Sequence, residues 1–261
     1  MNKINTQSLP GQNYNNACIF IPVSQMEQKK QHDQLTQEKT SAALAALQLV
    51  KDGMVLGLGS GSTVKIFMKL LAEKVKREGL KVYIVSSSYD TSILAATLGL
   101  TEVSLNSFTP DLSIDGADAV FPDKSLIKGG GGCLLREKLV NYYAREYVII
   151  VDHTKLRAKL DGPLTVPIEV HPMSYSQVVK ALRETFNAES SLRVFSEKKL
   201  GPAITDNGGF LLDATLKWSG DMRILEEKLK SLPGVLETGI FAIKKPSKIF
   251  VGRGESYTVI E

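Results

Sequence analysis

Residues 54–79 of the chain, MVLGLGSGSTVKIFMKLLAEKVKREG, decide the fold class. The stretch opens with a short apolar run, passes through a glycine-rich turn over residues 57–63, and then repeats apolar side chains at helical spacing until Gly79. A short apolar run predicts a buried strand, whereas apolar residues three and four positions apart predict an amphipathic helix that a glycine can end. A strand, a glycine turn and a helix in this order form the first unit of an α/β fold.

The same alternation continues toward the C-terminus. Further strands are predicted at residues 82–85, 103–105, 112–114 and 147–151, and helices at 92–98 and 132–145. An Ala- and Leu-rich helix is predicted upstream, at residues 40–50. Short, continuously apolar strands that alternate with helices are typical of a parallel sheet covered on both faces. We therefore expect an α/β core built on a buried parallel sheet.

The pattern changes after Pro163. Strands are predicted at residues 164–170, 192–195, 210–216 and 234–237, and helices at 176–186 and 221–232. This order of elements is the ferredoxin-like pattern and indicates a second, smaller α+β domain. Residues 1–31 are rich in Asn and Gln and show no sustained period, which predicts a disordered extension. The expected parts are the extension at 1–31, a catalytic domain at 32–162 plus 236–261, and the smaller domain at 163–235.

The composition argues against several classes of protein. The net charge is only +4 and no block of Lys and Arg stands out, so we expect no nucleic-acid partner. The two cysteines, Cys18 and Cys133, lie far apart, and no Cys or His pair has metal-ligand spacing. We therefore expect neither a disulfide framework nor a metal site. No apolar run is long enough to cross a membrane, so we expect a cytoplasmic protein with no membrane partner.

The glycine-rich turn at residues 57–63 has the features of an anion site. Glycines let successive backbone N–H groups point outward, the following helix adds its positive end, and Ser62 and Thr63 add hydroxyl donors. A dinucleotide site is disfavoured because Ser62 stands where the third glycine of that motif belongs. No Gly-Lys-Ser/Thr sequence is present to form a nucleoside-triphosphate loop. A monophosphate suits this turn best, although an ordinary strand-to-helix turn remains an alternative.

Two acids follow the predicted strand at residues 112–114. Asp115 and Asp118 lie past its C-terminal end, at the edge where open α/β sheets bind ligands. Across a glycine turn both carboxylates can face one cleft, where they would suit sugar hydroxyls and proton transfer better than a phosphate. Because Asp is also common in turns and at helix starts, the residues alone leave a capping role open.

The segment 128–138, KGGGGCLLREK, combines four consecutive glycines with charged residues. Such a run implies close approach of the backbone to another group, or positive φ angles. Lys128 stands at the loop entrance, where it could meet a developing oxyanion. Glu137 lies about a turn and a half into the predicted helix. A helical Glu usually lies in solvent beside a Lys or Arg, so this spacing does not by itself make Glu137 catalytic.

A fourth polar segment, residues 152–155, directly follows the apolar strand at 147–151. Lys155 would add positive charge beside a phosphate if the sheet is parallel, or it is an ordinary loop lysine. His153 has no metal-ligand spacing and is interpreted as a loop residue.

In combination, five segments resemble ribose-5-phosphate isomerase A. In chain order they are Gly57-x-Gly-Ser-Gly-Ser-Thr63, Val85-Ser-Ser-Ser88, Asp115-Gly-Ala-Asp118, Lys128-Gly-Gly-Gly131 with Arg136-Glu137-Lys138, and Thr205-Asp-Asn-Gly208. Each motif alone is weak, but five in this order, over residues 35–261, are specific. The resemblance implies a Rossmann-like core, a ferredoxin-like second domain, and a homodimer or homotetramer.

The resemblance also implies a reaction, the conversion of D-ribose 5-phosphate to D-ribulose 5-phosphate in the non-oxidative pentose phosphate pathway, without cofactor or metal. It implies Glu137 as the general base, Lys128 beside the reacting oxygens, and Asp115 and Asp118 as the acids that handle sugar hydroxyls and ring opening. The substrate-binding residues that it implies are Lys39, Ser60, Gly61, Ser62, Thr63, Asp115, Gly116, Ala117, Asp118, Lys128, Gly129, Gly130, Gly131 and Lys155.

A carboxylate base that works near neutrality must be partly desolvated, so we predict a raised pKa for Glu137. Its side chain should point into the cleft, close to Asp115, Asp118 and Lys128. The chain departs from the family pattern at Ala119, where the family usually has Glu, and in residues 1–31, which have no counterpart.

Two rival functions fit the sequence less well than the isomerase does. A sugar-phosphate sensor should carry a DNA-binding helix pair at its N-terminus, and residues 1–31 show no such pattern. A coenzyme A transferase with Glu137 as nucleophile would need a nucleotide-sized site, of which the short glycine turn gives little sign.

Overall fold

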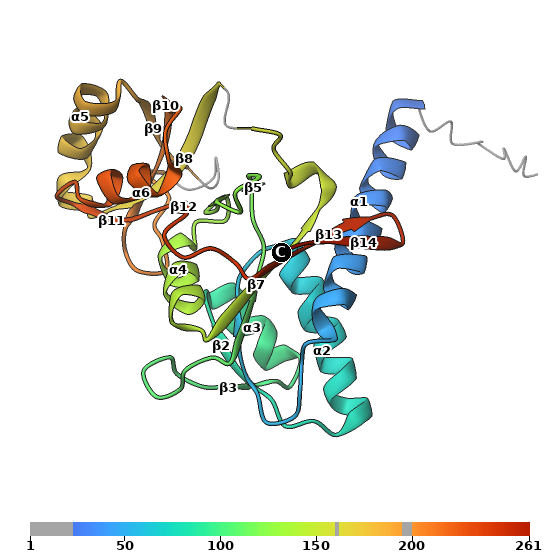
Figure 1. Ribbon diagram of the computed structural model, residues 1–261. Coiled ribbons are helices and arrows are strands. Elements are labelled where there is room, and N and C mark those ends of the chain that lie inside the picture. The colour runs from blue at the N-terminus through green and yellow to red at the C-terminus, as the bar shows by residue number, and fades with distance from the viewer. Residues whose placement is uncertain (1–22, 160–161, 195–199) are drawn as a thin grey trace, which may run out of the picture.

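The computed structural model describes residues 23–159, 162–194 and 200–261, and its centre is a seven-stranded sheet in the order β14-β13-β7-β4-β1-β2-β3 (Figure 1). The strands are β1 (Val55–Leu58), β2 (Tyr83–Ser86), β3 (Thr101–Glu102), β4 (Leu112–Asp115), β7 (Glu146–Asp152), β13 (Lys248–Arg253) and β14 (Ser256–Ile260). Every neighbouring pair is parallel except the β13–β14 hairpin. The predicted parallel-sheet core is therefore confirmed.

Helices cover both faces of this sheet. They are α1 (Val23–Leu47), α2 (Ser62–Glu78), α3 (Tyr89–Thr97) and α4 (Leu134–Tyr143). The first three share one core with the side chains of Leu56 and Leu58 on β1. The residue between them, Gly57, faces α4, where an added Cβ would lie 2.5 Å from Cγ1 of Val140. Glycine at this position therefore lets α4 approach the sheet closely.

The second sheet forms a separate lobe beside the first (Figure 1). Its strands, in the order β11-β8-β10-β9, are β8 (Pro163–Val170), β9 (Glu189–Leu192), β10 (Phe210–Lys217) and β11 (Val235–Thr238). All neighbouring pairs are antiparallel, and the helices between them are α5 (Tyr175–Phe186) and α6 (Met222–Lys230). The predicted ferredoxin-like order of elements is confirmed, while the exact domain boundaries stay a prediction.

A third, small sheet joins two strands from the first part of the chain to one strand that follows the second sheet. It pairs β5 (Ala119–Val120), β6 (Leu126–Ile127) and β12 (Ile240–Phe241). The apolar run at residues 240–243 predicts a strand there, and β12 occupies its first half. Strands of two residues carry no periodicity, so the sequence predicts neither β5 nor β6.

Two edge strands were predicted a few residues from where they lie. The predicted strands at 103–105 and 192–195 differ from β3 at Thr101–Glu102 and β9 at Glu189–Leu192, and residue 195 lies outside the described part of the chain. Apolar residues guided both predictions, but these strands lie at sheet edges and are largely polar and solvent-facing. Hydrogen bonds to the neighbouring strand, rather than burial of side chains, decide where an edge strand lies.

The predicted disordered extension, residues 1–31, needs a partial correction. Residues 1–22 lie outside the described part of the chain, but residues 23–31 belong to α1. No Gly or Pro interrupts residues 23–47, and the polar residues at the start of this stretch include several good helix formers, so the helix that begins there continues into the Ala-rich part.

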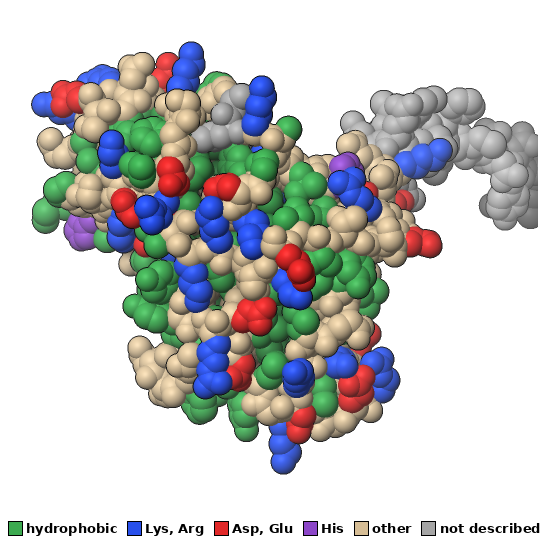
Figure 2. All heavy atoms as spheres, viewed as in Figure 1, with side chains coloured by type: hydrophobic (Ala, Val, Ile, Leu, Met, Phe, Trp, Pro, Cys, Tyr) green, Lys and Arg blue, Asp and Glu red, His purple; other side chains and the backbone are tan. Residues whose placement is uncertain are grey.

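Two observations concern the charge on one face of the molecule and the hydropathy of its helices. Basic and acidic side chains are interspersed over the face in Figure 2, without an extended basic tract. Across the described ranges, no helix has the length and hydropathy that a membrane crossing would require.

Candidate active site

The glycine turn between β1 and α2 is built around close contacts. Gly61 has φ +98° and precedes the first turn of α2, so it occupies a conformation that favours glycine. At Gly59, an added Cβ would lie 1.7 Å from Oδ1 of Asp115, so only glycine leaves room for that carboxylate. The hydroxyl of Ser60 is tied to Ser87 Oγ at 3.0 Å and Ser88 Oγ at 2.9 Å. The turn therefore has a defined shape that exposes the N-terminus of α2.

Asp115 lies beneath this turn, at the C-terminal end of β4, and is fully buried. Its Oδ1 accepts the N–H of Gly116 at 2.7 Å, and its Oδ2 accepts Nδ2 of Asn141 at 2.8 Å. The ammonium of Lys128 lies 3.0 Å from the same Oδ2. A buried carboxylate with this many partners is well ordered, so Asp115 can hold the side chains of Lys128 and Asn141 in place.

Lys128 connects two of the carboxylates of the site, Asp115 and Glu137. Its Nζ donates to the carbonyl of Gly116 at 2.7 Å and lies 3.2 Å from Oε1 of Glu137, in addition to its contact with Asp115. Burial acts to lower the pKa of Lys128, but the carboxylates of Asp115 and Glu137 together raise it above its ordinary value. The lysine is therefore a cation in the floor of the site.

Glu137 is only 5 % exposed, on the first turn of α4. Burial raises its pKa to about 8; Lys128 opposes this shift, and Asp115 and Asp118 reinforce it. The predicted raised pKa is confirmed. The prediction that Glu137 points into the site beside Lys128, and not into solvent, is also confirmed.

Asp118 holds the glycine loop that follows β6. Its Oδ2 accepts the N–H of Gly130 at 2.7 Å, and an added Cβ on Gly130 would lie 2.8 Å from Oδ1. Gly129 has φ +102°. The consecutive glycines thus allow both an unusual backbone conformation and close contact with a carboxylate, as the sequence indicated.

A cavity of about 140 Å³ unites these elements. Its lining comprises Lys39, Ser60, Gly61, Ser62, Thr63, Gly116, Ala117, Asp118, Lys128, Gly129, Gly130, Gly131, Glu137 and Lys155. All the predicted substrate-binding residues are among them except Asp115, which lies buried directly behind Lys128. One wall is basic and holds the start of α2, whereas the floor holds the Lys128–Glu137 pair.

The basic wall is assembled from three distant segments. Lys39 comes from α1, Lys155 from the short helix η1 (His153–Lys155), and Ser62 and Thr63 from α2. Two lysines beside a helix N-terminus favour an anion such as a phosphate. Glu38 fixes this arrangement, because its Oε2 lies 2.5 Å from Nδ1 of His153 and joins α1 to η1.

Three further residues shape the site, and sequence reasoning missed them. Asn141 joins Asp115 to Ser113: it donates to Asp115, and its Oδ1 accepts the hydroxyl of Ser113 at 2.7 Å. Because Asn141 comes one helical turn after Glu137, the sequence did indicate that it lies on the same side of α4. Glu38, adjacent to Lys39, carried no signal of its contact with His153. The third, Arg193, donates from Nη1 to the carbonyls of Gly129 at 2.7 Å and Gly130 at 3.1 Å. No local pattern could reveal that contact, because it links the second lobe to a loop more than sixty residues earlier.

The motif at residues 205–208 does not line the cavity. Asn207 and the backbone carbonyl of Asp206 accept from Arg136 on α4 at 2.8 Å and 2.9 Å, and the carboxylate of Asp206 accepts the N–H of Tyr89 at 2.7 Å. The motif therefore connects the second lobe to α3 and α4.

The site offers little to a metal ion or a thiol nucleophile. Among the described residues, no group of three or more His, Cys, Asp and Glu side chains is arranged to hold a metal. Burial raises the pKa of Cys133, at the start of α4, to about 11, so its thiol stays protonated near neutrality.

Comparison with known proteins gives one consistent result. The family model of ribose 5-phosphate isomerase A (phosphoriboisomerase A) matches residues 83–256. The ribose-5-phosphate isomerase A of Archaeoglobus fulgidus is 44% identical over 220 residues, which cover 84% of this chain and 96% of that protein. That of Prochlorococcus marinus strain NATL1A is 41% identical over 230 residues, covering 87% and 96%.

Solved structures agree. The ribose 5-phosphate isomerase A of Methanocaldococcus jannaschii superposes with a TM-score of 0.81 at 38% identity and covers 85% of this chain and 97% of its own. A D-ribose-5-phosphate isomerase in complex with phospho-erythronic acid superposes with a TM-score of 0.82 at 39% identity, with coverages of 87% and 99%.

Proposed function

The chain belongs to the ribose 5-phosphate isomerase A family, and on this basis we propose that it interconverts D-ribose 5-phosphate and D-ribulose 5-phosphate, with Glu137 as the general base. The observation that carries the proposal is the buried contact of 3.2 Å between Glu137 and Lys128 in the floor of a cavity with a basic wall. A base with a raised pKa beside a fixed cation is what proton abstraction next to a carbonyl requires.

The chemistry follows from these two groups. Glu137 takes the proton from C2 of the open-chain aldose, and the electron pair left behind forms the C1=C2 bond of an enediolate while negative charge develops on O1. Lys128 stabilises that charge. A proton moves from O2 to O1, and protonated Glu137 returns its proton to C1, which yields the ketose and regenerates the base. General-base catalysis of this kind typically contributes ~10²–10⁴-fold.

The phosphate end of the substrate would be held at the opposite wall. The backbone N–H groups and hydroxyls at residues 60–63, the start of α2, and the ammonium groups of Lys39 and Lys155 all line that side. Anchoring the phosphate there would orient the sugar toward Glu137, and such orientation lowers the barrier of the chemical step.

The two aspartates would act on the hydroxyl groups of the sugar. Asp118 lines the cavity and is exposed, so it is placed to accept a hydroxyl proton during ring opening. Asp115 is buried behind Lys128 and would act mainly by holding that lysine. Ala119, at the position where the family usually has Glu, is buried in β5 and leaves Asp118 without that neighbouring carboxylate.

The remaining expectations belong to the same proposal. We propose a homodimer or homotetramer that works in the cytoplasm, in the non-oxidative pentose phosphate pathway, with residues 163–235 as a separate ferredoxin-like domain. The free thiol of Cys133 is compatible with a reducing compartment.

The cavity is small, about 140 Å³, which suits a sugar phosphate better than a nucleotide-sized coenzyme.

The direct test is to incubate the purified protein with ribose 5-phosphate in the presence of EDTA and to measure ribulose 5-phosphate. We expect turnover that EDTA does not diminish. Absence of turnover would refute the isomerase, and loss of turnover only with EDTA would refute the metal-free mechanism.

A further inference from the structure

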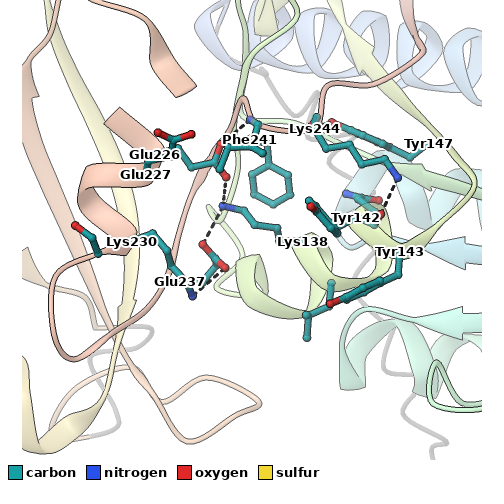
Figure 3. Close-up of a pocket in the computed structure, with 14 residues that line it drawn as sticks. Lys138, Tyr142, Tyr143, Tyr147, Glu226, Glu227, Lys230, Glu237, Phe241 and Lys244 are labelled. Atoms are coloured by element: carbon teal, nitrogen blue, oxygen red, sulfur yellow. Dashed lines mark hydrogen bonds and ion pairs between the residues drawn. The ribbon is translucent and has the colours of Figure 1, made fainter. Parts of the chain in front are cut away.

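A second cavity, of about 440 Å³, also borders α4 and shares no lining residue with the active-site cavity. Figure 3 shows the side chains that line it. Residues of α4 and α6, the start of β7 and the segment 237–244 line it. Its volume falls within the range of small-molecule sites, roughly 300–1,000 Å³. Neither the catalytic residues nor the basic wall of the active site contributes to it.

Aromatic side chains form much of its wall. Tyr142 and Tyr143 from α4, Tyr147 from β7 and Phe241 from β12 surround the space in Figure 3. Tyr142 and Tyr143 are 49% and 58% exposed, although each presents a large apolar ring. A flat, apolar molecule would remove these rings from water.

Of the three lysines that line the cavity, Lys138 and Lys230 form ion pairs with glutamates and Lys244 does not. Lys138 is paired with Glu226 at 2.7 Å and Glu237 at 2.9 Å, and Lys230 lies 3.2 Å from Glu237. Lys244 instead donates to the backbone carbonyls of Tyr142 and Ala144, both at 2.7 Å. Within the described ranges, no carboxylate lies within ion-pairing distance of Lys244.

This ammonium group lies over aromatic surface, 5.8 Å from the ring centre of Tyr142 and 6.0 Å from that of Tyr147. Two of its three N–H bonds are used by the carbonyls, which leaves one for a ligand. Partial burial lowers the pKa of Lys244, because the charged form lacks a compensating anion. An anionic group placed there would supply that compensation.

We propose that this cavity is a binding site for a small aromatic carboxylate, whose carboxylate pairs with Lys244 and whose ring packs among Tyr142, Tyr143 and Phe241. The same helix, α4, carries Glu137 on its other side. Asn141 lines the cavity and also donates to Asp115 at 2.8 Å. A bound ligand is therefore expected to change kcat and to leave KM unchanged, because the phosphate-binding wall lies elsewhere.

The binding test uses the full chain and 2-naphthoate as the probe, with its neutral amide, 2-naphthamide, as the matched ligand. Titration calorimetry should show 2-naphthoate binding at least tenfold more tightly than 2-naphthamide. Lys244→Met should remove that preference, and Lys244→Arg should retain it. The control is Lys245→Met, which removes the neighbouring lysine that pairs with Asp123 outside the cavity and should leave binding unchanged. Equal affinity of the two probes for the wild type would overturn the proposal, even if the Lys244 variants fail to fold.

Two further outcomes decide against the proposal. If 2-naphthoate competes with ribose 5-phosphate, it binds in the active site instead. If Tyr143→Glu converts an oligomer to a monomer in sedimentation velocity, a second copy of the chain covers this face. We expect neither, and we expect saturating 2-naphthoate to change kcat at least twofold in the wild type but not in Lys244→Met. The kcat measurement rests on the proposed function, whereas the binding measurement does not.

Discussion

The ammonium nitrogen of Lys128 lies 3.2 Å from Oε1 of Glu137, and both side chains are buried in the floor of one cavity. A cation at this distance favours the ionised form of the base, while burial disfavours it more strongly. The balance leaves a carboxyl group that can both accept and return a proton near neutral pH.

Glu137→Gln should reduce kcat by about 10²–10⁴-fold, since the amide cannot accept the proton from C2. Binding should persist, because the amide is similar in size and the basic wall is intact. Turnover is measured with ribose 5-phosphate, and binding by calorimetry with phospho-erythronic acid, the ligand of a related solved structure. Glu184→Gln, an exposed change on α5, serves as the control. Wild-type kcat in Glu137→Gln would show that another group is the base.

The activity should depend on pH through Glu137. Because burial raises its pKa to about 8, kcat/KM should increase with pH up to about that value and then level off. Lys128 should not limit the rate on the alkaline side, since its pKa is raised above its ordinary value. A profile that is flat between pH 6 and 9 would contradict this assignment.

Stability should follow the opposite trend over the same range. A carboxyl group whose pKa is higher in the folded state than in the unfolded state stabilises the fold while it is protonated. This contribution is present below pH 4.5 and is lost as pH rises toward about 8. The free energy of unfolding of the wild type should therefore fall relative to Glu137→Gln between pH 5 and 8, as urea titrations can measure.

Lys128→Met should lower kcat by about 10²–10³-fold, the usual effect of removing one group that stabilises an oxyanion. It also leaves Asp115 and Glu137 as neighbouring carboxylates without their cation, so the pKa of Glu137 should rise further. The pH profile should shift to higher pH accordingly. Lys76→Met, at an exposed position of α2, controls for the loss of a lysine. A reduced kcat with an unshifted profile would argue against electrostatic contact with Glu137.

Arg193 should act as a positioning residue for the glycine loop. It holds the carbonyls of Gly129 and Gly130 and is itself held by Asp213, whose Oδ2 accepts its Nε at 2.8 Å. Arg193→Met should lower kcat roughly tenfold, in line with the loss of hydrogen bonds to a charged group. Arg193→Lys should restore part of the activity. Arg183→Met, exposed on α5, is the matched control, and equal effects of the two Met variants would exclude a positioning role.

The Glu38–His153 pair should act on substrate binding. It joins α1 to η1, which carry Lys39 and Lys155 into the basic wall. Glu38→Gln should raise KM severalfold, and should weaken inhibition by inorganic phosphate in parallel, while kcat changes little. Glu73→Gln on α2, which is exposed, is the control. A fall in kcat at constant KM would show that the pair acts on Glu137 and not on phosphate binding.

Much of the site could be predicted because its parts follow strands. Asp115 comes at the end of β4 and the glycine turn at the end of β1, and in a parallel sheet these ends meet at one edge. Gly59 connects the two segments, because the glycine predicted for the turn is also the residue that makes room for the carboxylate of Asp115. The sequence predicts the edge strands β3 and β9 at the wrong residues, because hydrogen bonding to a neighbouring strand leaves no hydrophobic pattern in the sequence.

The sequence by itself determined the order of strands and helices, the glycine turns and the family motifs, because apolar spacing and backbone freedom are local properties. Only the tertiary structure decided that Glu137 is a buried carboxyl group and not a solvated helical residue. Its pKa depends on burial and on Lys128 and Asp115, which come from different segments of the chain. The same holds for Arg193, which contacts the glycine loop only because the second lobe folds back against it. Such contacts have no local signature, since they depend on how distant segments pack together.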